Sequence, residues 1–152
     1  MRSSNPFRKP MDAWRVTEDG IHLEYPIFYY ETTIPDEVSI KRSLKEVVSD
    51  VDFWGWERDE NGKIVDSSGK VFIAKFKKHQ GFSLFKIPTE YWSGIFPGEV
   101  ERIMEISEIK KIMISGIERN ATRIEEDLDI LKQEVNSMDS VREIISKCAV
   151  YL

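Results

Sequence analysis

The sequence contains a single cysteine, Cys148, among its 152 residues. One thiol cannot form an internal disulfide or a zinc site built from several cysteines, so a reducing compartment, the cytoplasm, is the simplest expectation. Long hydrophobic runs are also missing, since none approaches the ~18 residues that a membrane-spanning helix needs. We therefore expect a cytoplasmic protein that does not use a membrane.

An excess of positive charge is lacking as well. The chain carries 22 Lys and Arg against 27 Asp and Glu, which gives a formal net charge of −5. This charge excludes a protein that binds nucleic acid or a membrane through overall positive charge, and it suits an ordinary soluble domain. With 152 residues, 41% of them hydrophobic, the chain is long enough for one sizeable core and short for two.

Aromatic residues are nearly missing from the C-terminal part, because sixteen of the seventeen lie before Gly98 and only Tyr151 follows it. The two parts must therefore build their cores differently. We expect a flexible tail over residues 1–11, an antiparallel, aromatic-rich sheet over residues 12–98 and a helical region over residues 99–152. The last two parts are expected to form one cooperative domain of the α+β class.

The sheet part is expected to hold a hairpin, one short helix and a meander. The triplet Glu18-Asp19-Gly20 predicts a tight turn between strands at residues 14–17 and 21–25. Apolar residues at helical spacing predict the short helix over residues 38–48. Four β-prone runs between residues 53 and 87 predict the strands of the meander. Their predicted turns are Glu60-Asn61-Gly62, Ser67-Ser68-Gly69 and His79-Gln80-Gly81.

Helix is favoured after Gly98, because proline is absent there and Gly116 is the one further glycine. Pro88 is expected to close the sheet before this region. Between Ile114 and Met138 apolar residues recur at alternating spacings of three and four, as heptad a and d positions do. This stripe packs either within its own chain or against a second copy, as a coiled-coil homodimer. Its members are Ile114, Ile117, Ala121, Ile124, Leu128, Leu131, Val135 and Met138.

Two sets of residues are candidates for binding a protein partner. Trp54 and Trp56 share one face if their segment is extended, and such tryptophans anchor interfaces, although they are also common half-buried core residues. An acidic cluster in the helical region would speed association with a basic partner, or it would form a solvated helix face. This cluster consists of Glu125, Glu126, Asp127 and Asp129.

The predicted strands between Lys70 and Lys86 contain five lysines and no acidic residue, with phenylalanines among them. Such a surface can hold phosphates and stack bases, and Lys75, Lys77 and Lys78 are its candidate nucleic-acid contacts. The same lysines are equally expected on a solvated sheet face, where they guard against edge-to-edge aggregation.

The segment from Glu57 to Ile64 resembles part of an EF-hand calcium loop. Oxygen-bearing side chains occupy its first, third and fifth positions, a glycine the sixth and a hydrophobic residue the eighth. The glutamate that closes an EF-hand loop is replaced by Ser68. Because Asn61-Gly62 is also a preferred hairpin turn, we expect a turn here, with a weak cation site as the alternative. No metal or other cofactor is expected.

Residues suited to catalysis are few. Only His22 and His79 titrate near neutral pH, and neither belongs to a nucleophile motif. Cys148 lies on an apolar helix face, which is typical of a small core residue. We therefore expect no enzymatic activity.

The sequence thus favours a non-enzymatic protein-binding module. An inhibitor or immunity-type protein that neutralises a basic partner, such as a nuclease toxin, suits its small size and mild acidity. Two alternatives stay open. One is a nucleic-acid-associated protein that uses the Lys70–Lys86 strands, and the other is a homo-oligomeric structural protein that uses the heptad helix at residues 114–138.

Overall fold

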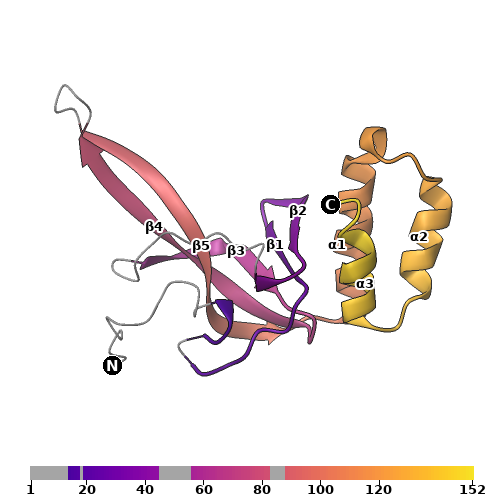
Figure 1. Ribbon diagram of the computed structural model, residues 1–152, viewed down its shortest axis with the longest axis horizontal. Helices are drawn as coiled ribbons and strands as arrows, with labels where there is room; N and C mark the ends of the chain where they lie inside the picture. The colour runs from indigo at the N-terminus through magenta and orange to yellow at the C-terminus, as the bar shows by residue number, and fades with distance from the viewer. Residues whose placement is uncertain (1–13, 18, 45–55, 83–87) are drawn as a thin grey trace.

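The computed structural model describes residues 14–17, 19–44, 56–82 and 88–152, without the side chains of residues 56–59, 76–82 and 88–96. Within these residues the chain forms a five-stranded antiparallel sheet followed by three α-helices (Figure 1), so the predicted α+β class is confirmed. The strands are β1 (Ile27–Glu31), β2 (Ile34–Lys41), β3 (Trp56–Val65), β4 (Lys70–Phe82) and β5 (Pro88–Ile103). Their spatial order is β2-β1-β3-β4-β5.

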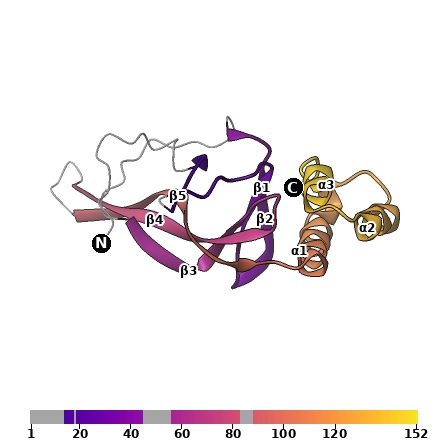
Figure 2. The ribbon, with the colours of Figure 1, turned by 90° about the horizontal axis from the view of Figure 1, so that it is seen from below.

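The helices lie together at one end of the sheet, beside β1 and β2 (Figure 2). They are α1 (Ile106–Arg119), α2 (Leu128–Ser137) and α3 (Val141–Cys148), and the short 3-10 helix η3 (Ala121–Arg123) lies between α1 and α2. Helix α1 packs against β2, and both α2 and α3 pack against α1. Among the described residues, no helix has the length and apolar character needed to cross a membrane.

Neighbouring residues of the same strand belong to two different cores. Phe28 and Val71 pack in the core under the helices, whereas Ile27 and Phe72 pack in a second core that includes Trp14. Successive side chains of a strand point to opposite faces of a sheet, so both faces are covered here. This double coverage explains why β1 and β4 contain continuous apolar runs rather than a strict alternation.

The first predicted hairpin is present in a minimal form. Val16 and His22 make an isolated antiparallel bridge, and the backbone N–H of Leu23 donates to the carbonyl of Arg15 at 2.9 Å. Gly20 has a φ of 78°, a left-handed conformation that glycine adopts without a steric penalty. The predicted turn is therefore confirmed, whereas the strands predicted at residues 14–17 and 21–25 are reduced to this single bridge.

The helix predicted over residues 38–48 is wrong in its described part, where β2 runs to Lys41. Val38 and Ile40 pair with Tyr30 and Phe28 of β1, and both pack against the core under the helices. Apolar residues two positions apart fit a strand as well as part of a helical pattern, so pairing with β1 decides between them. Residues 45–48 lie outside the described residues.

Of the three turns predicted in the meander, only Ser67-Ser68-Gly69 is a turn, and Gly69 has a φ of 87°. Glu60-Asn61-Gly62 lies inside β3, which passes it with a register shift between Asp59 and Lys63. The hairpin turn expected there is wrong, because Gly62 pairs with Glu31 of β1 and the segment continues as a strand. His79-Gln80-Gly81 likewise lies inside β4.

Pro88 begins a strand and does not close the sheet. It is the first residue of β5, a position where proline is tolerated, and β5 continues to Ile103. The sheet therefore ends five residues beyond the predicted boundary at residue 98. The predicted flexible tail at residues 1–11 lies outside the described residues.

The heptad stripe is divided between two antiparallel helices and does not form one continuous helix (Figure 1). Helix α1 ends at Arg119, and Asp127 caps a new helix, α2, that runs back along it. Ile117, Leu131 and Val135 are buried in the core under the helices. These three residues thus pack within the chain, which was one of the two alternatives, whereas the continuous heptad helix is wrong.

Candidate binding surfaces

Among the described residues, strands β4 and β5 extend beyond the rest of the sheet as a two-stranded ribbon. Strand β3 accompanies β4 as far as the pair Trp56 and Lys77, and from there β4 and β5 pair with each other up to Phe82 and Pro88. We call residues 78–82 and 88–92 the arm. Figures 1 and 2 show the arm projecting from the body, at the opposite end from the helices.

Strands β4 and β5 are closely packed between the arm and the helices. A Cβ added to Gly98 of β5 would lie 2.7 Å from the carbonyl oxygen of Ile73 and 3.1 Å from Cε of Lys75. The β4–β5 register also shifts at three places, between Val71 and Phe76–Lys77, and bulges of this kind bend and twist a ribbon. Only a residue without a side chain fits at Gly98, so the backbones of β4 and β5 approach closely here, between the arm and the helices.

An ion pair between a buried lysine and a partly exposed glutamate joins β3 and β5. Nζ of Lys63 in β3 lies 2.8 Å from Oε2 of Glu101 in β5, and the Lys63 side chain is only 8% exposed. Since β4 lies between these two strands, the pair bridges across it. A buried cation needs such a partner, and the pair therefore fixes β5 relative to β3 within the body of the sheet.

The candidate nucleic-acid residues Lys75, Lys77 and Lys78 all lie on β4, from the base of the arm into its first residue. Lys75 is half-buried, and its strand partner is Phe96, whereas Lys78 pairs with Trp92. Residue 86, the last lysine of the predicted strands, lies outside the described residues. The structure thus brings three of these lysines together on one short segment.

The acidic cluster lies at the other end of the molecule, around the start of α2. Oδ1 of Asp127 accepts hydrogen bonds from the N–H groups of Asp129 at 2.9 Å and Ile130 at 3.2 Å. Asp127 is therefore the N-cap of α2, and Asp129 lies in its positive first turn. Glu125 and Glu126 are exposed in the preceding loop. The predicted acidic helix face is wrong: the cluster covers a helix start and the loop before it.

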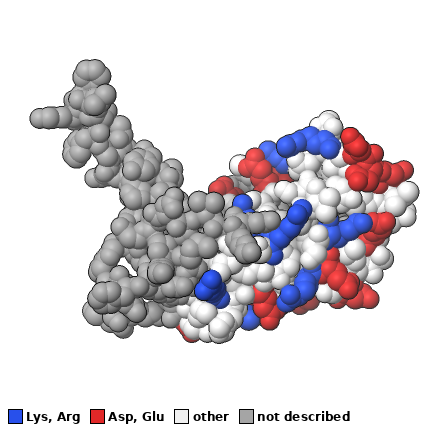
Figure 3. Space-filling view, viewed as in Figure 1, with Lys and Arg blue, Asp and Glu red and all other residues white. Residues whose placement is uncertain are grey.

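Acidic side chains gather at this helical end on the face shown in Figure 3, with Lys and Arg side chains between them. The tryptophan candidates do not join them. Trp54 lies outside the described residues, and Trp56 begins β3 at the base of the arm. The structure therefore places Trp56 and the acidic cluster, the two sets of candidate partner-binding residues, in different parts of the fold.

Comparisons with protein-family models, curated proteins and solved structures found no match. The function of the arm, and of the surface around the acidic cluster, which we call the acidic end, therefore has to be inferred from their geometry and charge. Within the described part of the chain, no group of three or more His, Cys, Asp or Glu side chains is arranged to hold a metal ion.

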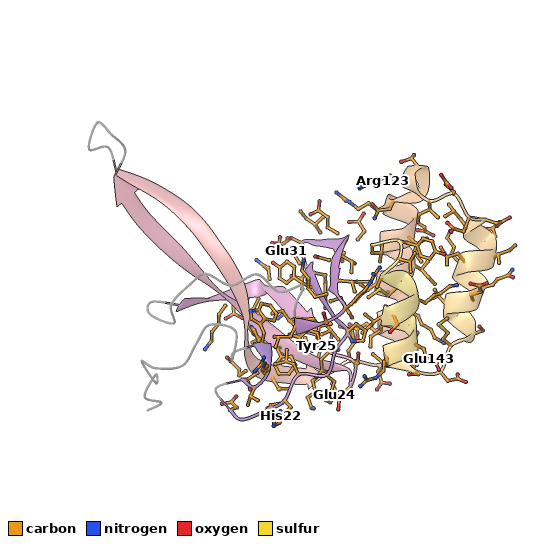
Figure 4. The ribbon with its side chains drawn as sticks, viewed as in Figure 1. His22, Glu24, Tyr25, Glu31, Arg123 and Glu143 are labelled. Atoms are coloured by element: carbon orange, nitrogen blue, oxygen red, sulfur yellow. The ribbon has the colours of Figure 1, made fainter. Side chains whose placement is uncertain are left out.

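Two of the groups suited to acid–base or nucleophilic chemistry, Asp66 and Cys148, are buried inside the fold. The buried carboxylate of Asp66 accepts hydrogen bonds from the N–H groups of Glu24, Ser68 and Lys70 at 3.0–3.2 Å, so it stabilises the β3–β4 turn. Burial raises the pKa of the Cys148 thiol to about 12. His22 is exposed at the edge of the molecule (Figure 4).

Tyr25 is a further residue with a shifted pKa, and sequence reasoning did not single it out. Burial raises the pKa of its phenol, and its Oη donates a hydrogen bond to the carbonyl of Trp14 at 2.7 Å. This bond joins the two ends of the N-terminal segment that covers the second core. Tyr25 therefore has a structural task, which no sequence motif indicates.

Proposed function

We propose that this protein is a non-enzymatic binding module whose arm engages a macromolecular partner. Support comes from the length of the arm beyond the last residue of β3 that pairs with β4. An isolated two-stranded hairpin is only marginally stable in water, so it gains from being covered. Tyr91 and Trp92, which belong to the arm, are residue types enriched at the centres of interfaces.

The acidic end is a second candidate binding surface. It is the surface that an inhibitor or immunity-type protein would use. Glu125, Glu126 and Asp129 are exposed around the start of α2, where they would attract a basic protein. Asp127 contributes less, because its carboxylate already caps the helix. We keep this surface as the alternative for a basic partner, and we propose the cytoplasm as location because Cys148 is a free, buried thiol.

A homodimer through the heptad stripe has less support. Ile117, Leu131 and Val135 are already buried within the chain. Pairing them with a second copy would require the α1–α2 hairpin to open and expose this core, which costs the burial that it now provides. We therefore propose a monomeric body.

The register of β4 and β5 allows a direct test. Lys77 and Ser93 are strand partners, so residues 78–92 can be replaced by Asn-Gly, which forms the tight turn preferred in hairpins. We expect the shortened protein to unfold at nearly the same temperature as the full chain, because both cores lie below the cut. We expect it to lose the macromolecule that affinity capture recovers with the full chain.

A charge-reversal variant serves as the matched comparison. Replacing Glu125, Glu126 and Asp129 by lysine changes the other surface and leaves the arm intact. If this variant loses the captured partner while the shortened protein keeps it, the acidic end is the binding surface and the proposal for the arm is wrong.

A further inference from the structure

Strand β2 forms one edge of the sheet, with only β1 beside it among the described strands. Backbone N–H and C=O groups along the outer side of an edge strand can pair with a strand of another chain. Within the described part of the chain, no loop or helix makes a backbone hydrogen bond to residues 34–41. The outer side of β2 is therefore open there to a further strand.

Two apolar side chains of β2 are incompletely covered. Val38 and Ile40 pack against the core under the helices but remain partly exposed, whereas Tyr30 and Phe28, their partners in β1, are buried. A strand added beside β2 would place its own side chains next to them on the same face of the sheet. The edge thus offers apolar surface as well as backbone groups.

The residues of this edge form a pattern that is complementary to itself. An apolar residue stands on each side of Ser39, and charged residues follow, acidic toward the N-terminus and basic toward the C-terminus. The segment reads Asp36-Glu37-Val38-Ser39-Ile40-Lys41-Arg42. If two copies pair antiparallel about Ser39, Glu37 of each lies opposite Lys41 of the other, and Val38 lies opposite Ile40.

We infer that two copies of this protein associate through the outer edges of their β2 strands, antiparallel and centred on Ser39, so that their sheets become continuous. This contact is independent of the arm, because β2 and the strands of the arm lie at opposite ends of the strand order. Glu37 is available for it: Oε1 lies 2.8 Å from Nη2 of Arg119, and 60% of the side chain stays exposed.

The charges also select this register. Charged residues on an edge strand commonly prevent pairing with other chains, but here their order favours one arrangement. Centring the contact on Glu37 or on Lys41 would place two like charges opposite each other, and so would parallel pairing in register. Like charges directly opposite destabilise a strand pair, so these alternatives are disfavoured.

The contact is small. It involves residues 36–42 of each copy, against roughly 20–30 residues a side in a standard interface, so the dimer is weak. The body is therefore monomeric at micromolar concentration, as proposed above, and pairs at higher concentration. A partner that binds two copies close together would favour the same contact, because it raises their effective concentration.

Analytical ultracentrifugation of the full chain, up to about 1 mM protein at low salt, tests the inference. The dimer fraction should rise with concentration. Glu37→Lys and Lys41→Glu should each weaken association about tenfold or more, because each variant places like charges opposite each other twice in the dimer. An equimolar mixture of the two variants should associate again, since each introduced charge then faces an opposite charge of the other copy.

Glu143→Lys serves as the matched control. It makes the same change of charge at an exposed position in the first turn of α3 and should associate as the unchanged chain does. A full chain that stays monomeric at the highest concentration would overturn the inference. So would a mixture that associates no better than either variant alone, or an equal loss in the control, which would reflect overall charge.

Disulfide trapping locates the contact. The two Ser39 residues would have Cα atoms about 4.5–5.5 Å apart, within the range of a disulfide, so Ser39→Cys should link two chains under mild oxidation. Ser137→Cys, at an exposed position of α2, should not, and Cys148 is buried. If the full chain dimerises but Ser39→Cys links no faster than Ser137→Cys, the contact lies elsewhere and the inference is wrong.

The version with Asn-Gly in place of residues 78–92 separates this inference from the proposed function. It should dimerise as the full chain does, whether or not it keeps the captured partner. Loss of dimerisation in this version would place the contact at the arm and overturn the inference, while the arm would remain a binding element.

Discussion

The guanidinium of Arg102 in β5 and the carboxylate of Glu108 in α1 form a two-pronged ion pair. Nη1 donates to Oε2 at 2.9 Å, and Nη2 donates to Oε1 at 2.6 Å. The pair connects the last strand to the first helix, where the chain passes from the sheet to the helical layer. The hydrogen bonds from Arg102 lower the pKa of Glu108 below its usual 4.5.

The first prediction concerns the pH dependence of this pair. Because the pKa of Glu108 is lowered in the folded state, its contribution to stability is present above pH 4.5 and is lost as the pH falls through the lowered pKa. Both side chains are about two-fifths exposed, so Glu108→Gln should lower the free energy of unfolding by less than about 1 kcal/mol at pH 7.

Urea unfolding of the two proteins at neutral and at acidic pH measures this difference. The difference should shrink once Glu108 is protonated in both folded and unfolded chains. A difference that stays the same in acid would mean that the pair contributes through packing and not through charge.

The second prediction compares two glycines. Gly98→Ala should destabilise the protein by about 1–3 kcal/mol, because the added Cβ would lie 2.7 Å from the backbone oxygen of Ile73, which cannot move aside easily. Gly116→Ala should cost less, since the nearest atom is a Leu152 methyl at 3.1 Å and alanine favours helix by about 1 kcal/mol over glycine. Chemical denaturation of both variants checks the order, and the reverse order would contradict the close approach of β4 and β5 at Gly98.

The third prediction concerns the heptad stripe. Leu131→Ala should destabilise the protein by about 2–5 kcal/mol, because Leu131 is only 2% exposed in the core under the helices. Ile130→Ala, at the exposed neighbouring position, should have little effect. The midpoint of unfolding should not change with protein concentration, as expected when the stripe packs within one chain. A midpoint that rises with concentration would instead indicate the homodimer.

The fourth prediction concerns the single thiol. Burial raises the pKa of Cys148 to about 12, so almost no thiolate is present at neutral or mildly alkaline pH. A thiol reagent such as Ellman's reagent should therefore react slowly with the native protein and rapidly in denaturant. Rapid reaction of the native protein would show that α3 opens readily from the body.

The fold class could be predicted because the two parts of the chain differ in composition. Residues that favour strands and turns lie before Gly98, and residues that favour helix follow it. One helix cap also follows from local sequence, since Ser140 precedes the helical run and its Oγ accepts from the N–H of Glu143 at 3.4 Å. These features depend on residues that are close together in the sequence, so they can be predicted from the sequence alone.

The arm could not be predicted, since its length depends on which strands pair. Three glycine-containing triplets looked alike, but only the one ending in Gly69 turns the chain. Gly62 is drawn into β3 by pairing with β1, and Gly81 into β4 by pairing with Thr89 of β5. Pairing partners distant in the sequence override local turn preference, so the candidate surface with the most geometric support emerged only from the fold.

The helical cover of the sheet has a consequence for synthesis on the ribosome. Phe28 and Tyr30, made early, share a core with Ile144, Ile145 and Cys148 of α3, the last described element to be made. Until α3 leaves the exit tunnel, this face of the nascent sheet lacks part of its cover and stays apolar toward solvent. Chains released before Val141 should therefore be substrates for chaperones and proteases, however well their strands have already paired.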